Sequence, residues 1–526
     1  MWITERLLKN YYPLLLTLIV LLAVIVRVYD LNKLPAILNR DEAALAYNAY
    51  LLDQTSKDEW GRTRPLFLES FGDYKLPGYP LFIELFFKFL PANDLTVRLP
   101  SALAGSLLVI LIALLAQRFS LRRATQLTIA FFAALMPFAV FYSRMAFEAN
   151  LALSLMVLVM LGCFRQFKRY RFKDFLLDFT TILLALLMLF TYNTPLILLP
   201  FIIICTAIYR GIFNWKNWFF LAIGLIGVLI FASVNLLPLS AQKSGITIFS
   251  DETVWMNWIQ YRENFDGIWQ RILGHKYFYF AQIIVQNFIK SLLPSFLLIR
   301  GGNHPWHNLP GFGHLFWTQY LLFCTGIVIT IWEFWLERRR PAKIKKQAIL
   351  LSLLLASLLP SVVTVDSPHA TRSLLFFVLT IIFSGFAIEK IMSHSFSKYW
   401  LALILILFSF ESANYLRHYF IDYRQNQNVF QPGFNSVIQK ATQENRDLPI
   451  AVIDSAGFHY IIAAWYLKTP PEKYFSTIVM QQPDSIGFRY GQQLQNLHFI
   501  AQPQDRSAQE KVEIIWQNNQ WEINHY

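Results

Sequence analysis

The sequence has few charged residues and few cysteines for its length. Asp, Glu, Lys and Arg make up only 15% of its 526 residues, whereas 55% are hydrophobic and 16% are aromatic. Ordinary soluble domains carry about 25% charged residues, so this composition excludes a single soluble domain and indicates a polytopic membrane protein. The cysteines, Cys163, Cys205 and Cys324, lie inside apolar segments. The sequence therefore predicts neither a disulfide framework nor a thiolate metal site.

Several functional motifs are also missing. The chain has no phosphate-binding glycine loop, no zinc-protease signature and no internal repeat. Its net charge of +13 comes from Lys and Arg concentrated in short loops between apolar runs. Such loops follow the positive-inside rule, so membrane topology explains the charge and we expect no nucleic-acid partner.

Apolar runs long enough to cross about 30 Å of hydrocarbon predict about eleven transmembrane helices. Basic clusters occur in every second connection, which places the start of the chain in the cytoplasm and its last part outside. The first run lacks a small-x-small cleavage site, so we interpret it as a retained anchor helix. The predicted spans are 12–28, 99–117, 125–143, 149–164, 176–192, 195–210, 218–237, 315–335, 347–365, 374–389 and 399–415.

Three polar stretches, 30–98, 238–314 and 416–526, fall outside in this topology. The domains expected are thus a transmembrane catalytic domain over 1–415, which includes the first two stretches, and a small extracytoplasmic α/β domain over 416–526. The pattern predicts surface helices near 41–52, 79–90 and 277–298. In the tail it predicts a strand at 450–454, a helix at 457–467 and a closing hairpin around Asn518-Asn519.

The first outside stretch carries two groups of polar residues suited to chemistry. Asp41 and Glu42, both candidate catalytic residues, precede an Ala/Leu-rich segment, where Asp41 could be a catalytic base or a helix N-cap. Asp73, Tyr74 and Lys75, which are candidate substrate-binding residues, stand before Leu76-Pro77, and a proline there favours an extended turn. Lys75 could meet a phosphate as a point charge, or it could form a surface ion pair.

Other candidates lie at the outside ends of later spans. Arg144 and Glu148 follow the third span, where a flanking arginine also commonly snorkels to the interface. His369 and Arg372 belong to Asp366-Ser367-Pro368-His369-Ala370-Thr371-Arg372, which could bind an anionic head group or serve as an interfacial anchor. His304 and His307 are spaced closely enough to hold a divalent metal, or they could be structural residues of their loop. No cofactor is required by any motif.

These residues together resemble the membrane-embedded GT-C glycosyltransferases. The pattern consists of an acidic pair after the first span, a Lys-Pro loop, and Ser-Arg-x-Ala followed by an acid. Protein O-mannosyltransferases and aminoarabinose lipid A transferases are the most similar in pattern. The resemblance implies that Asp41 is the catalytic acid of the first loop, that Lys75 contacts the carrier phosphate and that Glu148 is the acid of the second loop. The chain departs from the family pattern at Tyr74, where an acid can stand.

The resemblance implies an inverting glycosyltransferase of a bacterial-type plasma membrane, active on the extracytoplasmic face. Its donor would be a polyprenyl-phosphate sugar, and its acceptor a hydroxyl group of a protein, a lipid or a cell-envelope glycan. Asp41 would activate this hydroxyl, while Lys75, Arg144 and Arg372 would stabilise the departing phosphate. Two alternatives remain: a transporter or flippase of lipid-linked sugars, and an oligosaccharide polymerase or ligase.

Overall fold

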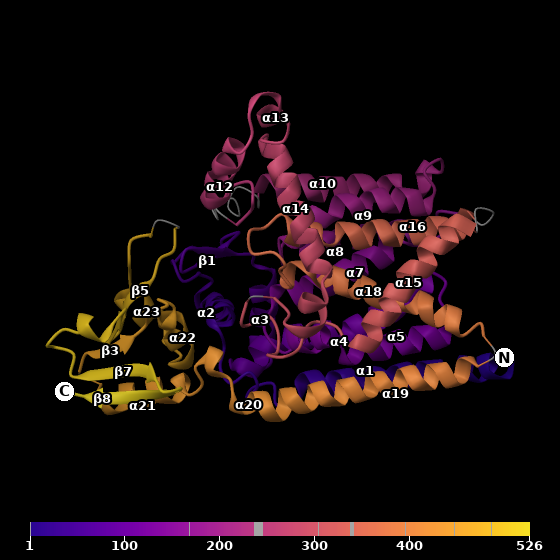
Figure 1. The fold of residues 1–526 in the computed structure, drawn as a ribbon. Helices are drawn as coiled ribbons and strands as arrows, with labels where there is room; N and C mark the ends of the chain where they lie inside the picture. Colours follow the sequence, from indigo (N-terminus) through magenta and orange to yellow (C-terminus); the bar gives the residue numbers. More distant parts are fainter. Residues whose placement is uncertain are drawn as a thin grey trace. The chain divides into compact units, whose positions relative to one another are not determined.

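The computed structural model describes residues 2–167, 169–235, 246–302, 304–336, 341–394, 396–446, 448–484 and 487–526. The basic residues 338–340, which support the expected topology, lie outside them. Contacts within the chain divide it into two compact units, whose segments Figure 1 traces by colour. The first comprises 1–27, 102–143 and 148–417, and the second 28–101, 144–147 and 418–526. The expected boundary near residue 415 lies close to one division, but the first outside stretch groups with the tail.

The first unit consists of apolar helices (Figure 1). Over the described residues, each predicted span overlaps one helix or two consecutive helices, because long charge-poor runs have few alternatives to helix in a bilayer. These helices are α1 (Trp2–Val28), α4 (Asp94–Arg118), α5 (Arg123–Leu135) with α6 (Pro137–Ser143), α7 (Glu148–Cys163), α8 (Phe172–Leu189), α9 (Thr194–Arg210), α10 (Phe219–Asn235), α15 (Trp317–Leu336), α16 (Pro341–Ala356) with α17 (Leu359–Val362), α18 (Leu374–Ile391) and α19 (Ser397–Arg417).

Among the described residues, five helices are long and apolar enough to cross a membrane by themselves, or six if α5 and α6 form one bent span. The five lie at Asn10–Val28, Asp94–Arg118, Trp317–Leu336, Thr371–Ile391 and Ser397–Gln425. The expected class, an α-helical membrane protein with several spans, is confirmed. The total of about eleven spans stays a prediction.

Helix α18 lies at the centre of the first unit and is buried along most of its length. It packs against α15, α5 and α16. The contact with α15 is close, because a Cβ atom at Gly326 would lie 1.9 Å from the carbonyl oxygen of Phe383. Small residues allow such an approach of two helix backbones inside a membrane.

The second outside stretch belongs to the first unit, and its described part is largely helical. It contains α12 (Glu252–Glu263), α13 (Gly267–Ile272) and α14 (Lys276–Leu292). The helix expected near 277–298 is therefore present, and its position at the membrane surface stays a prediction.

The second unit combines the first outside stretch with the tail. Helix α2 (Arg40–Thr55) packs against α3 (Gly78–Phe87), α22 (His459–Tyr466) and α23 (Pro471–Thr477). A short hairpin, β1 (Leu68–Ser70) and β2 (Asp73–Lys75), lies between α2 and α3 in the sequence.

The tail forms the expected small α/β fold, with α21 (Phe434–Glu444) packed on α22 and on the last two strands. Its sheet has the order β4-β5-β6-β3-β7-β8, in which β3 runs parallel to both neighbours. Asn518 and Asn519 have φ of 51° and 61°, as a two-residue hairpin turn requires, so the closing hairpin is confirmed. The strands are β3 (Ile450–Ile453), β4 (Val479–Met480), β5 (Gly491–Leu494), β6 (Leu497–Ile500), β7 (Val512–Gln517) and β8 (Gln520–His525).

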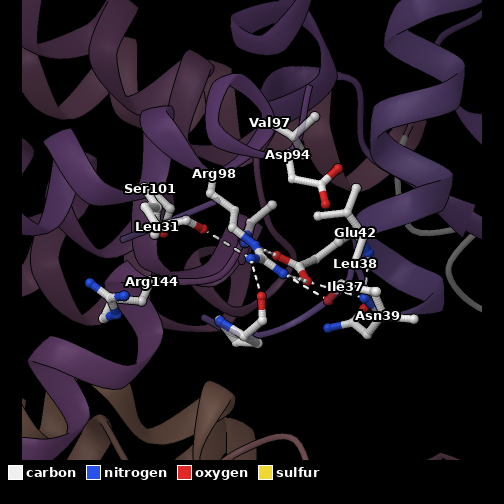
Figure 2. Close-up of polar contacts among 12 residues, drawn as sticks. Leu31, Ile37, Leu38, Asn39, Glu42, Asp94, Val97, Arg98, Ser101 and Arg144 are labelled. Carbon is white, nitrogen blue, oxygen red and sulfur yellow. Dashed lines mark hydrogen bonds and ion pairs between the residues drawn. The ribbon is translucent and has the colours of Figure 1, made fainter. Parts of the chain in front are cut away.

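A buried ion pair between Glu42 and Arg98 lies inside the second unit (Figure 2), with exposed fractions of 1% and 0%. Nε and Nη2 of Arg98 donate to Oε1 and Oε2 of Glu42 at 3.0 and 3.2 Å. Nη1 donates to the carbonyl oxygens of Leu31 and Pro35, and Nη2 also donates to that of Ile37. All five N–H groups of the guanidinium thus have acceptors.

Glu42 also accepts two backbone hydrogen bonds. The N–H of Asn39 donates to Oε2 at 3.1 Å, and the N–H of Ala146 donates to Oε1 at 2.7 Å. One carboxylate therefore joins the start of α2 to the turn at 144–147, which lies a hundred residues further along the chain. We expected Glu42 to be catalytic beside Asp41. Both of its oxygens are enclosed and used by structural partners, so this position favours a structural role, and the catalytic role stays a prediction.

We predict that Arg98→Leu lowers the stability of the protein by about 3–5 kcal/mol, because Glu42 would remain buried without its counter-ion. Arg98→Lys should be intermediate, since an ammonium has three donors in place of five. The measurement is the apparent unfolding temperature in detergent. The control is Arg424→Leu, which removes a half-exposed pair with Asp30 and should cost at most about 1 kcal/mol. Equal unfolding temperatures for Arg98→Leu and the wild type would contradict the structural role of the pair.

Candidate active site

The N-terminus of α2 is capped by Asn39. Its Oδ1 accepts hydrogen bonds from the backbone N–H groups of Asp41 and Glu42 at 2.9 and 3.0 Å. In turn, Oε2 of Glu42 accepts a hydrogen bond from the backbone N–H of Asn39. This reciprocal arrangement is a capping box. The alternative that Asp41 is the N-cap is therefore wrong. The side chain of Asp41 lies in the first helical turn, where a carboxylate is favourable, and is 39% exposed.

The β1–β2 hairpin determines where Asp73 and Lys75 point. Phe71 and Gly72 form its turn with φ of 43° and 78°, and a Cβ at position 72 would lie 2.2 Å from the carbonyl oxygen of Gly487. Only glycine fits this approach without a shift. Successive strand side chains alternate, so Asp73 and Lys75 share one face while Tyr74 lies on the other.

Lys75 joins the two acids at the centre of the candidate site. Its Nζ lies 2.8 Å from Oδ1 of Asp41 and 3.2 Å from Oδ2 of Asp73. Lys75 is 7% exposed, whereas the Asp41 side chain remains open to solvent. The structure thus brings together Asp41, Asp73 and Lys75, in an arrangement with one positive and two negative charges.

Tyr74 occupies a different environment. It stands opposite Glu69 in the hairpin, and burial together with the charge of Glu69 raises the pKa of its hydroxyl. It is therefore separated from Lys75 by the sheet itself, and its expected role in substrate binding finds no support in this position.

Two arginines of the second unit stack on aromatic rings. The guanidinium of Arg40 lies 4.2 Å from the ring centre of Phe458. The guanidinium of Arg144 lies 4.8 Å from the ring centre of Phe420, and its Nη2 donates to the carbonyl oxygen of Leu34 at 3.0 Å. Arg144 is fully buried. This packing fixes its guanidinium far more firmly than a snorkelling arginine would be fixed.

A second buried acid, Glu59, contacts the β1–β2 hairpin. The sequence patterns do not identify this residue. Its Oε2 accepts hydrogen bonds from Asn48 and Ser70, and its Oε1 accepts one from the hydroxyl of Tyr460 at 3.1 Å. The same hydroxyl accepts the N–H of Phe71 at the hairpin turn. Burial raises the pKa of Glu59 to about 8, so this carboxyl group is protonated at neutral pH.

The other expected residues belong to the first unit. Glu148 is the first residue of α7. His369 and Arg372 both contact Asp366, through Nε2 at 3.4 Å and Nη1 at 2.5 Å. Burial, together with Arg372, lowers the pKa of His369 to about 2, so its imidazole is neutral. Asp366, His369 and Arg372 thus lie together, and their role in binding an anionic head group stays a prediction.

His304 and His307, the candidate metal ligands, stack with ring centres 4.4 Å apart and planes at 21°. The ring of His369 lies 4.9 Å from that of His307. Within the described parts of the chain, no group of three or more His, Cys, Asp or Glu residues has the geometry to hold a metal ion. The stacked rings of His304 and His307 do not by themselves support a metal site.

Comparisons with known proteins agree with this architecture. Residues 75–237 match the family of dolichyl-phosphate-mannose-protein mannosyltransferases, so that the match begins at Lys75. No curated protein sequence matches the chain.

Two solved enzymes have a similar fold. The apo oligosaccharyltransferase of Archaeoglobus fulgidus superposes with a TM-score of 0.54 at 12% identity, over 87% of this chain and 64% of that one. This chain thus spans less than two thirds of that enzyme. ArnT of Cupriavidus metallidurans superposes with a TM-score of 0.51 in the apo state and 0.50 bound to undecaprenyl phosphate. Both comparisons have 12% identity and cover 86% of this chain and 84% of ArnT. The expected GT-C fold and resemblance are confirmed.

We predict that Glu59→Gln flattens the pH dependence of stability. The folded-state pKa of Glu59, about 8, lies above its ordinary value of 4.5, so the folded protein keeps a proton that the unfolded chain loses. This group therefore lowers stability as the pH rises from about 5 to about 8. The unfolding temperature of the wild type should fall over this range by more than that of Glu59→Gln. Glu444→Gln, at an exposed position, is the control, and identical slopes for Glu59→Gln and the wild type would refute the protonated state.

Proposed function

We propose that this protein is an inverting glycosyltransferase that moves a sugar from a polyprenyl-phosphate carrier to a hydroxyl group on the outer face of the membrane. The acceptor hydroxyl belongs to a protein, a lipid or a cell-envelope glycan. The observation that carries the proposal is the position of Lys75 between Asp41 and Asp73. The fold similarity to an enzyme solved with undecaprenyl phosphate supports a polyprenyl-phosphate donor.

In the proposed reaction, Asp41 is the general base. Its carboxylate is the more exposed partner of Lys75, and Asn39 rather than Asp41 caps the helix. Asp41 accepts the proton of the acceptor hydroxyl while this oxygen attacks the anomeric carbon. The bond from the anomeric carbon to the phosphate oxygen breaks on the opposite face of the sugar, which inverts the configuration. A phosphate leaves without needing a proton, so a second carboxylic acid is not required.

Lys75 would link donor binding to activation of the base. One ammonium cannot neutralise two carboxylates and a phosphate together, so the arriving phosphate draws Lys75 away from Asp41. Asp41 then loses its contact with Lys75 and becomes a stronger base, because a neighbouring cation favours the ionised form of a carboxylate. Lysine suits this exchange since its charge sits at the end of a flexible four-carbon stem.

We predict that Asp41→Asn lowers turnover by about 10²–10⁴-fold, the usual contribution of a general base. Asparagine keeps the size of the side chain, so the protein should still accumulate in the membrane. The control is Asp53→Asn on the same helix, which removes the surface pair with Lys88 and should leave turnover unchanged. Wild-type turnover in Asp41→Asn would leave only a structural role for this residue.

We predict that Lys75→Gln lowers kcat/KM for a polyprenyl-phosphate sugar by about 10–100-fold, as expected when a hydrogen bond to a charged group is lost. Lys88→Gln is the matched control, since it also removes a Lys–Asp pair of the second unit. The assay uses purified protein in detergent, with labelled donor and candidate acceptors. A flippase would move lipid across vesicles and transfer no sugar in detergent. Identification of the acceptor that gains the label separates the proposed transferase from a polymerase or ligase.

A further inference from the structure

A cavity of about 660 Å³ opens at one end of the helices of the first unit. Its walls come from the residues after α4, from the last turns of α15 and α18, and from the first turns of α16. It contains four cationic and two acidic side chains, namely Arg122, Lys343, Lys346, Lys390, Glu333 and Glu389. The proposed transfer reaction uses none of these residues.

The cavity lies at the membrane face opposite to Asp366 and Arg372. These two residues precede the N-terminus of α18, whereas Glu389 and Lys390 form its last turn. The 18 residues of α18 rise about 27 Å, close to the thickness of the hydrocarbon core. On α15, Trp332 and Trp335 are exposed at the level of Glu333. Exposed tryptophans are typical of the head-group region, so the cavity opens at the depth of lipid head groups.

The charges in the cavity leave two cations without a carboxylate. Glu389 Oε2 pairs with Nε of Arg122 at 3.0 Å, and Glu333 Oε1 pairs with Nζ of Lys343 at 2.8 Å. Lys346 donates only to neutral groups, the carbonyl oxygen of residue 118 and the hydroxyl of residue 120. Lys390 has no carboxylate partner within the described chain. An anion would be attracted to these two lysines.

One buried acceptor in the wall also lacks a partner. Gln347 is 2% exposed, and its Nε2 donates to Oε2 of Glu333. Because a carboxylate only accepts, this bond fixes which end of the amide carries oxygen. Its Oε1 has no hydrogen-bond donor among the described residues. A buried unpaired acceptor is costly, so a ligand that carries a hydroxyl group would satisfy it.

Apolar side chains complete the wall and distinguish a lipid from a soluble anion. Phe119, Leu121 and Phe386 line the same cavity. Basic pockets between transmembrane helices bind the head groups of acidic phospholipids. We propose that this cavity binds an anionic phospholipid with a hydroxylated head group, such as phosphatidylglycerol. Lys346 and Lys390 bind its phosphate, Gln347 accepts its hydroxyl, and the apolar wall meets the start of its acyl chains.

The experiment uses purified, delipidated full-length protein mixed with equal amounts of phosphatidylglycerol and phosphatidylcholine. Native mass spectrometry counts the lipids retained. The wild type should keep one phosphatidylglycerol, and Lys346→Gln/Lys390→Gln should reduce its retention by about tenfold or more. The control is Lys216→Gln/Lys398→Gln, which removes the same charge at exposed positions outside the cavity. Equal retention by the cavity variant and the control would overturn the proposal.

Two further arms identify the ligand. Inorganic phosphate at the same concentration should not displace the lipid, and displacement would assign the cavity to a soluble anion instead. Phosphatidylethanol, which keeps the phosphodiester charge but lacks the head-group hydroxyl, should be retained less well, and equal retention would overturn the role of Gln347. Lys390→Gln alone repeats the test without disturbing Lys346, whose hydrogen bonds also hold the loop after α4. Its unfolding temperature in phosphatidylcholine should equal that of the wild type.

Discussion

The ion pair of Glu42 with Arg98 is the interaction on which the second unit depends. Moving both charges out of water is expensive, and mutual attraction compensates only when the remaining donors and acceptors are also satisfied. Here every N–H of Arg98 has an oxygen, and Glu42 binds two backbone N–H groups as well. The pair thereby holds the chain before α2, the start of α2 and the turn at 144–147 in one arrangement.

This constraint also determines where Asp41 points. Neighbouring residues on a helix project about 100° apart, since 3.6 residues complete a turn. When Glu42 faces Arg98 in the interior, Asp41 must face another side, where Lys75 of the hairpin meets it. Asp41 and Glu42 are adjacent carboxylates of similar chemistry, but they lie in different environments. Glu42 supports the architecture, and its burial leaves Asp41 as the carboxylate of the two that is open to solvent.

The apolar helices, the tail fold and the closing hairpin were predictable from the sequence, because hydrophobic runs, strand alternation and Asn-Asn turns are local signals. The sequence indicated that Asp41, Asp73 and Lys75 are suited to one site, and the family resemblance gave roles to Asp41 and Lys75 alone. The structural role of Glu42 was not predictable from the sequence, since its partners Arg98 and Ala146 lie far along the chain. No sequence pattern indicated the burial of Glu59 either. An acid in a polar loop looks exposed until tertiary packing encloses it.

The two cations expected to bind phosphate in the second unit differ in how they are held. Arg144 is fully buried, stacked on Phe420 and bonded to the carbonyl oxygen of Leu34. It cannot reach a new anion without abandoning these contacts. Lys75 is held by two carboxylates through its terminal ammonium, and a phosphate offers the same kind of oxygen in their place. An exchange between equivalent partners costs little, so in the proposed reaction Lys75 rather than Arg144 is the cation that responds to the donor.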